Sequence, residues 1–180
     1  TDTKEGLMIE LSAPFPNSEI HFTTDGSEPN LNSLKYSTPI LLKKSSILKA
    51  IYFENGVKQG NNFIQEFILN KATGKDIKLL TEPRKKYSVG GAFSLIDGIK
   101  GSLPWSGRDW LGFLGDDMIA TIDLGREQEI SQAVVDVLSA EESWIYLPKE
   151  IEILVSSDGL NFKSIKIVGR EYISKYERNV

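Results

Sequence analysis

Apolar and polar residues alternate with a period of two along most of the chain, which predicts β-strands rather than helices. Residues 47–53 are apolar at nearly every position, so we expect a strand that is buried on both faces. The run ends at Asn55-Gly56, a typical tight-hairpin dipeptide because both central positions of a type I′ turn need a positive φ. Residues 63–69 predict the next strand, and Asp25-Gly26 predicts another turn of the same kind.

A polar break at residues 70–75 divides this pattern into two series of strands. The short strands and frequent turns before the break are typical of a small Ig-like sandwich. After the break, strands are predicted over residues 77–80, 118–124, 133–138, 151–155 and 162–168, the last two joined at Asp158-Gly159. We therefore expect a first domain over residues 1–70, a linker over residues 71–76 and a second domain over residues 77–180.

Residues 87–117 form a long stretch rich in glycine and aromatic residues, without periodicity. Loops of this length inside a compact domain are usually functional or disordered, and a bound metal could order this one. No convincing helix is predicted anywhere. Residues 126–129 are the single short helical candidate, and a turn suits them equally well.

Composition and charge narrow the classes of function. The chain has 180 residues, 40% of them hydrophobic and 26% charged, which is an ordinary soluble globular composition. The net charge of −4 argues against a nucleic-acid partner held by phosphate neutralisation. The absence of cysteine excludes disulfides, thiolate metal sites and cysteine nucleophiles.

Targeting segments are not evident in the sequence. No apolar run approaches the roughly 20 residues of a membrane-spanning helix, so membrane insertion is not expected. No signal peptide precedes the strands. The chain begins at Thr1 without an initiator methionine, which suggests an excised or processed piece and leaves the presence of a targeting segment open.

The residue types needed for glycoside hydrolysis are not arranged for it. Such enzymes use two carboxyl groups, or one acid with substrate assistance, commonly on a barrel of roughly 250 residues. Asp116-Asp117 and Glu141-Glu142 are adjacent pairs, but neighbouring strand residues point to opposite faces, so solvated loop acids are expected. The lone His21 lacks partners for a triad or a zinc site and fits the face of a strand.

Aromatic residues in the loops are the other candidates for chemistry. Trp105, Trp110, Trp144 and Tyr146 all lie in loop-like stretches. An aromatic ring can stack on the apolar C–H faces of a sugar, while Arg108 could hydrogen-bond the hydroxyl groups. Large aromatic residues more often fill cores, so a carbohydrate site and a packing role both remain open.

The first series of strands resembles the C-terminal domain of bacterial chitobiases and β-N-acetylhexosaminidases. The resemblance is carried by residues 20–29 (Ile-His-Phe-Thr-Thr-Asp-Gly-Ser-Glu-Pro), with Tyr36, Pro39-Ile40, residues 48–50 and Asn55-Gly56.

The second series resembles discoidin (coagulation factor V/VIII type C) domains and family 32 carbohydrate-binding modules. This resemblance is carried by Asp97-Gly98, residues 122–125 and residues 156–162. Residues 90–113 and 144–148 look like the tail of Bacteroides-type β-N-acetylhexosaminidases of glycoside hydrolase family 20. Together the resemblances imply an Ig-like β-sandwich followed by a discoidin-like β jelly roll.

In the discoidin resemblance, an Asp-Gly turn followed by Ser or Thr commonly holds a structural calcium ion, and Asp97 and Ser102 match this spacing. Ile99 stands where the family often has another acid, and the late glutamate of the family is not found. The alternative is a turn whose aspartate accepts local backbone hydrogen bonds. Trp105 resembles the core tryptophan of the family.

The resemblance also implies a closing strand that the chain does not contain, since it stops at residues 176–180. We therefore expect the jelly roll to lack its last strand or strands, which would leave unpaired backbone edges.

The resemblances imply a non-catalytic accessory region of a secreted, periplasmic or outer-surface β-N-acetylhexosaminidase, whose parent enzyme hydrolyses terminal N-acetylhexosamine. The region would bind glycans with N-acetylhexosamine or galactose-type sugars and would adjoin the catalytic domain of the same chain. One alternative is a structural spacer that packs on the catalytic domain without a ligand. A weaker alternative is adhesion to a protein or lipid surface, although the acidic charge disfavours anionic membranes.

Overall fold

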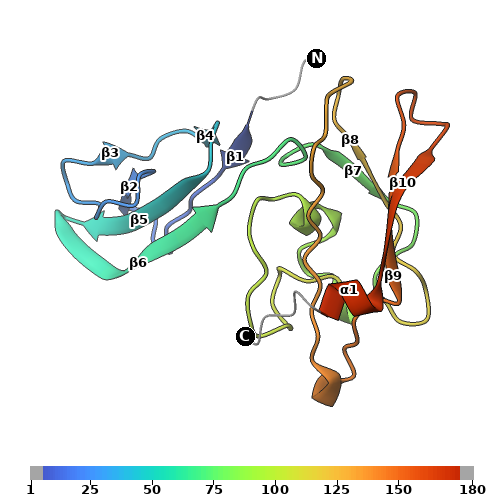
Figure 1. Ribbon diagram of the computed structural model, residues 1–180. Coiled ribbons are helices and arrows are strands. Elements are labelled where there is room, and N and C mark those ends of the chain that lie inside the picture. The colour runs from blue at the N-terminus through green and yellow to red at the C-terminus, as the bar shows by residue number, and fades with distance from the viewer. Residues whose placement is uncertain (1–5, 175–180) are drawn as a thin grey trace.

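The computed structural model describes residues 6–174, and its regular structure is almost entirely β, as the alternating pattern predicts (Figure 1). The strands pair in antiparallel sheets that are compatible with a β-sandwich and form no closed barrel in the described part of the chain. The all-β prediction is therefore confirmed.

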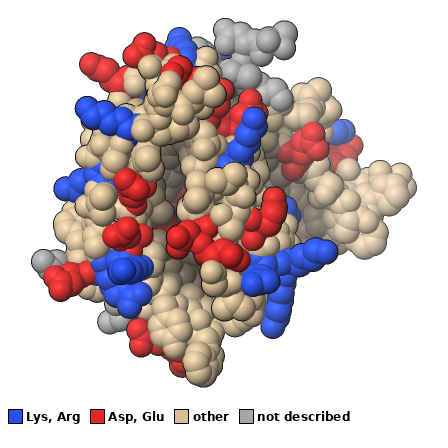
Figure 2. Space-filling model, turned by 90° about the vertical axis from the view of Figure 1, so that its right-hand side faces the viewer, with Lys and Arg blue, Asp and Glu red and all other residues tan. Residues whose placement is uncertain are grey.

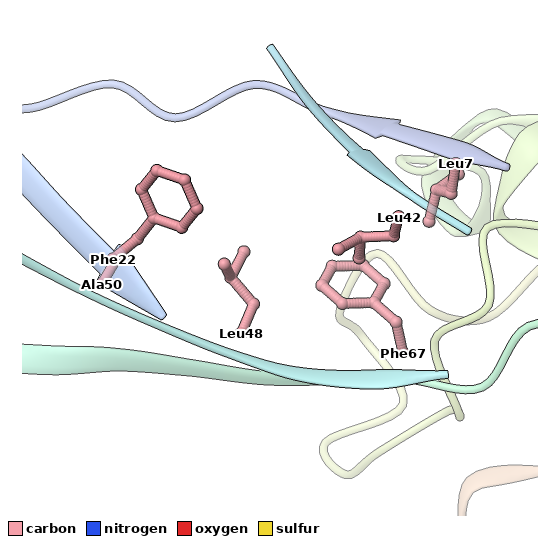
Figure 3. Packing of buried hydrophobic residues seen from close by; sticks show 6 residues of the cluster. All are labelled: Leu7, Phe22, Leu42, Leu48, Ala50 and Phe67. Carbon is pink, nitrogen blue, oxygen red and sulfur yellow. The ribbon is translucent and has the colours of Figure 1, made fainter. Parts of the chain in front are cut away.

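The first half of the chain is built from two sheets that share one core. Its strands are β1 (Leu7–Ile9), β2 (Glu19–Thr23), β3 (Leu34–Lys35), β4 (Ile40–Leu42), β5 (Ser46–Glu54) and β6 (Val57–Phe67). One sheet has the order β3-β2-β5-β6, and β1 pairs with β4 in the other. Both sheets contribute side chains to one buried cluster, shown in Figure 3: Leu7, Phe22, Leu42, Leu48, Ala50 and Phe67.

Strand β5 is central to this half because it pairs with β2 on one side and β6 on the other. Leu48 has an exposed fraction of 0% and Ala50 is also buried within the cluster. Ile51 and Phe53 are buried outside that cluster, and the Phe53 ring lies 5.3 Å from the His21 ring, centroid to centroid. The predicted burial of residues 47–53 on both faces is thus confirmed for most of the strand.

The two predicted turns differ in outcome. Asn55 and Gly56 have φ of 50° and 77°, so the hairpin between β5 and β6 has the predicted positive φ at both positions. At Asp25-Gly26 only the glycine has a positive φ, of 81°, and the prediction of a second such turn is wrong.

The Asp25 turn differs because side-chain and distant backbone groups hold it. The Asp25 carboxylate accepts the N–H and O–H of Ser27, at 3.0 and 2.6 Å, and these bonds lower its pKa. The Gly26 N–H donates to the Ile47 carbonyl at 3.0 Å. The chain is therefore fixed to β5 here instead of reversing into an adjacent hairpin.

The second half contains two separate antiparallel pairs. Its elements are β7 (Asp76–Leu79), η1 (Lys85–Tyr87), η2 (Ala92–Leu95), β8 (Ala120–Asp123), η3 (Glu141–Ser143), β9 (Glu150–Val155), β10 (Lys163–Gly169) and α1 (Arg170–Ser174). β7 pairs with β8, and β9 pairs with β10. These four strands fall where the alternation predicts them, with ends shifted by one or two residues.

The turn between β9 and β10 is held by Asp158, as the Asp-Gly pattern predicts. Its carboxylate accepts the backbone N–H groups of Leu160 and Asn161, at 2.9 and 2.8 Å, and the side-chain amide of Asn161 at 2.7 Å. These bonds and one from Ser156 lower the pKa of Asp158. Gly159 supplies the positive φ of 70°.

Two expectations about the second half are wrong. Residues 133–138 form no strand, and Val134 and Val135 are exposed, because the segment finds no ladder partner among residues 6–174 and β-propensity depends on such context. The short helix α1 was not anticipated. Its Ile173 side chain is buried and the Arg170 N–H donates to the Lys149 carbonyl at 2.9 Å, so tertiary contacts stabilise it. Residues 126–129 form no helix, in agreement with the turn alternative.

In the described residues, the strands of the second half form two separate pairs and do not assemble into the jelly roll that was expected. Among the described residues of this half, Ile96 and Ile173 are the buried hydrophobic residues, whereas Leu154, Ile165 and Ile167 on the β9–β10 pair stay exposed. Residues 176–180, at which the sequence was expected to stop short of a closing strand, lie outside the described part of the chain.

Replacing Leu48 by alanine should destabilise the first half by about 2–5 kcal/mol, because the cavity forms at a site with no exposure. Ile47→Ala is the matched control, since this neighbour on β5 is 41% exposed and should cost about 1 kcal/mol or less. Urea unfolding of both variants measures the two free energies. An equal loss in both would contradict a core centred on β5.

Candidate functional site

The aromatic residues predicted from the sequence fall into two groups. Trp105, Trp110 and the exposed Arg108 belong to the long loop between η2 and β8. Trp144 and Tyr146 follow η3, whose turn protrudes at the lower edge of Figure 1. No residue of the first group lines the cleft beside that turn. A single site containing all the predicted residues is therefore not formed.

The first group is held by contacts within its own loop. The Trp105 ring packs edge-on against Tyr87, with centroids 5.7 Å apart. Trp110 donates its Nε1–H to the Ser102 carbonyl at 2.8 Å. Its ring covers Gly101 so closely that a Cβ there would lie 2.5 Å from Cζ2. Both indoles are half-buried and organise the loop.

The two predicted calcium ligands lie near a third oxygen ligand that the sequence reasoning missed. Asp97 accepts the Ile99 N–H at 2.8 Å, as in the local-turn alternative. Ser102 donates its Oγ–H and N–H to Asp109 Oδ2, at 2.8 and 3.2 Å. Burial raises the pKa of Asp97, and the charge of Asp109 raises it further. Asp109 is seven residues from Ser102 along the chain, and the fold of the loop brings the two together.

The side chains of Asp97, Ser102 and Asp109 could hold a calcium ion only if backbone carbonyl groups supplied further ligands. Calcium takes six to eight oxygen ligands. Asp97 and Asp109 offer carboxylates and Ser102 offers a hydroxyl. Within residues 6–174, no group of three or more His, Asp or Glu side chains is placed to hold a metal ion, so loop carbonyls would have to complete the shell.

The Asp97 loop is also the joint between the two halves. The Ile68 N–H donates to the Gly98 carbonyl at 2.7 Å, and the Gly74 N–H donates to the Ile96 carbonyl at 2.9 Å. Ile99 packs against the buried cluster of the first half. Ile99 therefore has a packing role at the joint.

The second group borders an open cleft of about 640 Å³. Residues 140 to 145 form a tight turn, closed by reciprocal backbone hydrogen bonds between Ala140 and Ile145 at 3.0 and 3.1 Å. Trp144 ends this turn in the left-handed conformation, with φ of 60°, and its side chain is 83% exposed. Tyr146, 54% exposed, lines the cleft; Trp144 stands two residues before it and does not line it.

Charged side chains line the same cleft. Glu141 and Glu142 come from the turn, and Arg170 and Glu171 from α1. The Arg170 guanidinium donates to the carbonyls of Leu147, at 2.9 Å, and Pro148, at 3.4 Å. Glu141 and Glu142 are exposed to solvent, as expected. They lie in the wall of the cleft because the pairing of Ala140 with Ile145 folds this segment into a turn.

His21 lies far from either group in the fold, on β2 of the first half. It is buried, its Nδ1 lies 3.0 Å from the Ser33 carbonyl oxygen, and its ring contacts Phe53. This agrees with a strand-face residue.

The surface gives no sign of a strongly charged partner on the side shown in Figure 2, where acidic and basic side chains are interspersed. Over the described residues, no helix is both long and apolar enough to cross a membrane.

Comparison with known families finds a similarity in the first half of the chain. Residues 9–67 match the family model described as Fn3 associated, from the last residue of β1 to the end of β6. This match covers less than half of the 180-residue chain. No curated protein matches the chain significantly. The region in which the Ig-like domain was predicted is thus similar to the Fn3-associated family.

Replacing Gly98 by alanine should destabilise the joint by more than the backbone strain of alanine at a positive φ, because the added Cβ would also crowd its neighbours. Gly98 has φ of 76°, and a Cβ would lie 3.3 Å from both the Ile68 carbonyl oxygen and Thr73 Cγ2. Gly56 is the matched control, because its φ is 77° and a Cβ would meet nothing within 4 Å. We expect Gly56→Ala to cost about 1–2 kcal/mol and Gly98→Ala about 1 kcal/mol more.

Chemical unfolding measures both free energies, and limited proteolysis of residues 68–76 reports opening of the joint. Faster cleavage only in Gly98→Ala is the expected result. Equal cleavage and equal cost in both variants would mean that the joint does not couple the halves.

Proposed function

We propose that this chain is a non-catalytic accessory region that binds glycans beside the catalytic domain of a β-N-acetylhexosaminidase. The observation that carries the proposal is the 83% exposure of Trp144 on a tight turn beside the Tyr146 cleft. Large aromatic side chains are usually covered, and one held out on a rigid turn is available to a ligand.

The cleft has the chemistry that a sugar requires. Tyr146 lines the cleft and offers the apolar face of its ring to the C–H surface of a pyranose, and the exposed Trp144, two residues earlier on the turn, offers a second aromatic surface outside the lining. Glu141, Glu142 and Arg170 offer acceptors and donors to its hydroxyl groups. A weak site is sufficient, because attachment to an enzyme raises the effective concentration of the glycan near the reaction.

The parent enzyme is inferred from the resemblance of residues 90–113 and 144–148 to family 20 tails, and the Fn3-associated domain at residues 9–67 is in keeping with it. Its reaction would be hydrolysis of terminal N-acetylhexosamine, at a periplasmic, outer-surface or secreted location. The purified chain itself should release no nitrophenol from a nitrophenyl N-acetylglucosaminide.

A structural spacer is the second candidate, and the joint favours it. Gly98 and Ile99 attach the second half to the core of the first. Trp105 and Trp110 pack within their own loop and leave little aromatic surface there for a ligand. A spacer would transmit this fixed geometry to the catalytic domain without any ligand.

Glycan binding predicts that Trp144→Ala and Tyr146→Ala lose affinity for a bound sugar by about tenfold or more, because each removes a stacking surface. Calorimetric titration with N-acetylglucosamine, N-acetylgalactosamine, galactose and chito-oligosaccharides measures it. Leu160→Ala is the control, as Leu160 is also 83% exposed but lies on the β9–β10 turn. Trp110→Ala tests whether the aromatic residues of the loop between η2 and β8 also contribute to sugar affinity. No heat with any sugar from folded wild-type protein would favour the spacer.

We also propose a structural calcium ion held by Asp97, Asp109, Ser102 and loop carbonyls. Millimolar calcium should then raise the Tm of the wild-type chain by a few degrees, about 3 °C or more. Asp97→Asn should abolish the rise, since the amide can still accept the Ile99 N–H but carries no charge. Asp116→Asn, at an exposed position, should retain it. A Tm indifferent to calcium in the wild type would contradict the ion.

A further inference from the structure

We propose that Asn55 is a site of spontaneous deamidation, at which the folded chain converts this asparagine to isoaspartate and aspartate. The inference concerns the hairpin of the first half and does not depend on glycan binding. Asparagine is a thermolabile residue, and a following glycine leaves the next backbone nitrogen open to attack on the side-chain amide. Asn55-Gly56 is the one Asn-Gly dipeptide of the sequence.

The turn between β5 and β6 leaves both reacting groups free. Asn55 and Gly56 are exposed, and they lie at the tip of the hairpin, at the left edge of Figure 1. Within the described residues, neither the Asn55 side-chain amide nor the Gly56 N–H has a hydrogen-bond partner. A Cβ on Gly56 would meet nothing within 4 Å. Rotation of the turn into the reactive geometry therefore displaces no side chain packed on Gly56.

The reaction needs only water and a base. The base removes the proton from the Gly56 nitrogen, which attacks Cγ of Asn55, and the new N–Cγ bond closes a succinimide ring. The Cγ–Nδ2 bond breaks, and the nitrogen leaves as ammonia after taking a proton from the solvent. Water then opens the ring at either carbonyl carbon, which gives isoaspartate or aspartate. No electrons are transferred in any step.

Two of the three Asp-Gly dipeptides could react in the same way, with loss of water, but their groups are already engaged. The Gly26 N–H donates to the Ile47 carbonyl at 3.0 Å, and the Gly159 N–H donates to Ser156 Oγ at 2.9 Å. The Asp25 and Asp158 carboxylates accept hydrogen bonds that lower their pKa. An ionised carboxylate has no oxygen that leaves as water, so both sites are protected.

The third Asp-Gly dipeptide is protected by the joint. Asp97 is half-buried and accepts the Ile99 N–H at 2.8 Å. The Gly98 carbonyl accepts the Ile68 N–H at 2.7 Å, and a Cβ on Gly98 would lie 3.3 Å from the Ile68 carbonyl oxygen. Ring closure at Asp97 would have to break these contacts. The folded chain should therefore react at Asn55 alone among these four dipeptides.

Isoaspartate would disrupt the hairpin that contains the core strand β5. Its main chain runs through Cβ, so the turn gains a methylene group between β5 and β6. The two-residue turn depends on a positive φ at both positions, and Asn55 and Gly56 have φ of 50° and 77°. The product also adds one negative charge to a chain whose net charge is −4. We expect the modified chain to lose about 4 °C or more of Tm.

The experiment stores the full chain for several weeks at body temperature and mildly alkaline pH, both folded and unfolded in urea. Peptide mapping by mass spectrometry, with fragmentation that separates isoaspartate from aspartate, measures the product at each of the four dipeptides. The matched control is Asn55→Gly, which removes the amide but retains the turn, because Gly-Gly also suits a type I′ hairpin. The Tm of each stored sample is compared with that of fresh protein.

The expected result for the folded chain is isoaspartate at Asn55, unmodified Asp25, Asp97 and Asp158, and a lowered Tm after storage. The Asn55→Gly variant should lose both the product and the fall in Tm. Modification of Asn55 in urea but not in the folded chain would overturn the proposal, because the closed turn would then protect the amide. Isoaspartate at Asp25 or Asp158 of the folded chain as fast as at Asn55 would overturn the selectivity.

Discussion

Burial of β5 on both faces is the constraint on which the rest of the structure depends. Leu48 has no exposed surface, and it can be covered only if β1 and β4 form a second layer over the sheet of β2, β5 and β6. That layer brings Leu7 and Leu42 into the cluster and leaves a border where Ile99 of the second half packs. The loop that holds Gly98 therefore takes its position from the core of the first half.

The two groups of aromatic residues show that the local backbone determines whether an indole side chain packs within its loop or stays exposed to solvent. Trp110 is retained in its loop because Gly101 leaves room for the indole and the Ser102 carbonyl accepts its N–H. Trp144 has a left-handed backbone at the end of a tight turn, and its ring stays in solvent. The same residue type thus has a structural role in one loop and is available for a ligand in the other.

The joint and the cleft lie on different parts of the chain. The joint fixes the second half through two backbone hydrogen bonds and one apolar contact. The cleft lies on the turn before β9 and on α1, away from the joint, and its charged groups are exposed. Substitutions in the cleft can therefore change its surface without disturbing the core of the first half.

The sequence by itself determined the all-β class, the strands near residues 47–53, 118–124 and 151–168, and the Asn55-Gly56 and Asp158-Gly159 turns, because these depend on alternation and on local backbone chemistry. Only the tertiary structure decided the rest. Residues 133–138 have strand propensity but no partner, and α1 exists because Ile173 finds a buried place. Glu141, Tyr146 and Arg170 share a cleft because distant segments meet, which no spacing along the chain encodes.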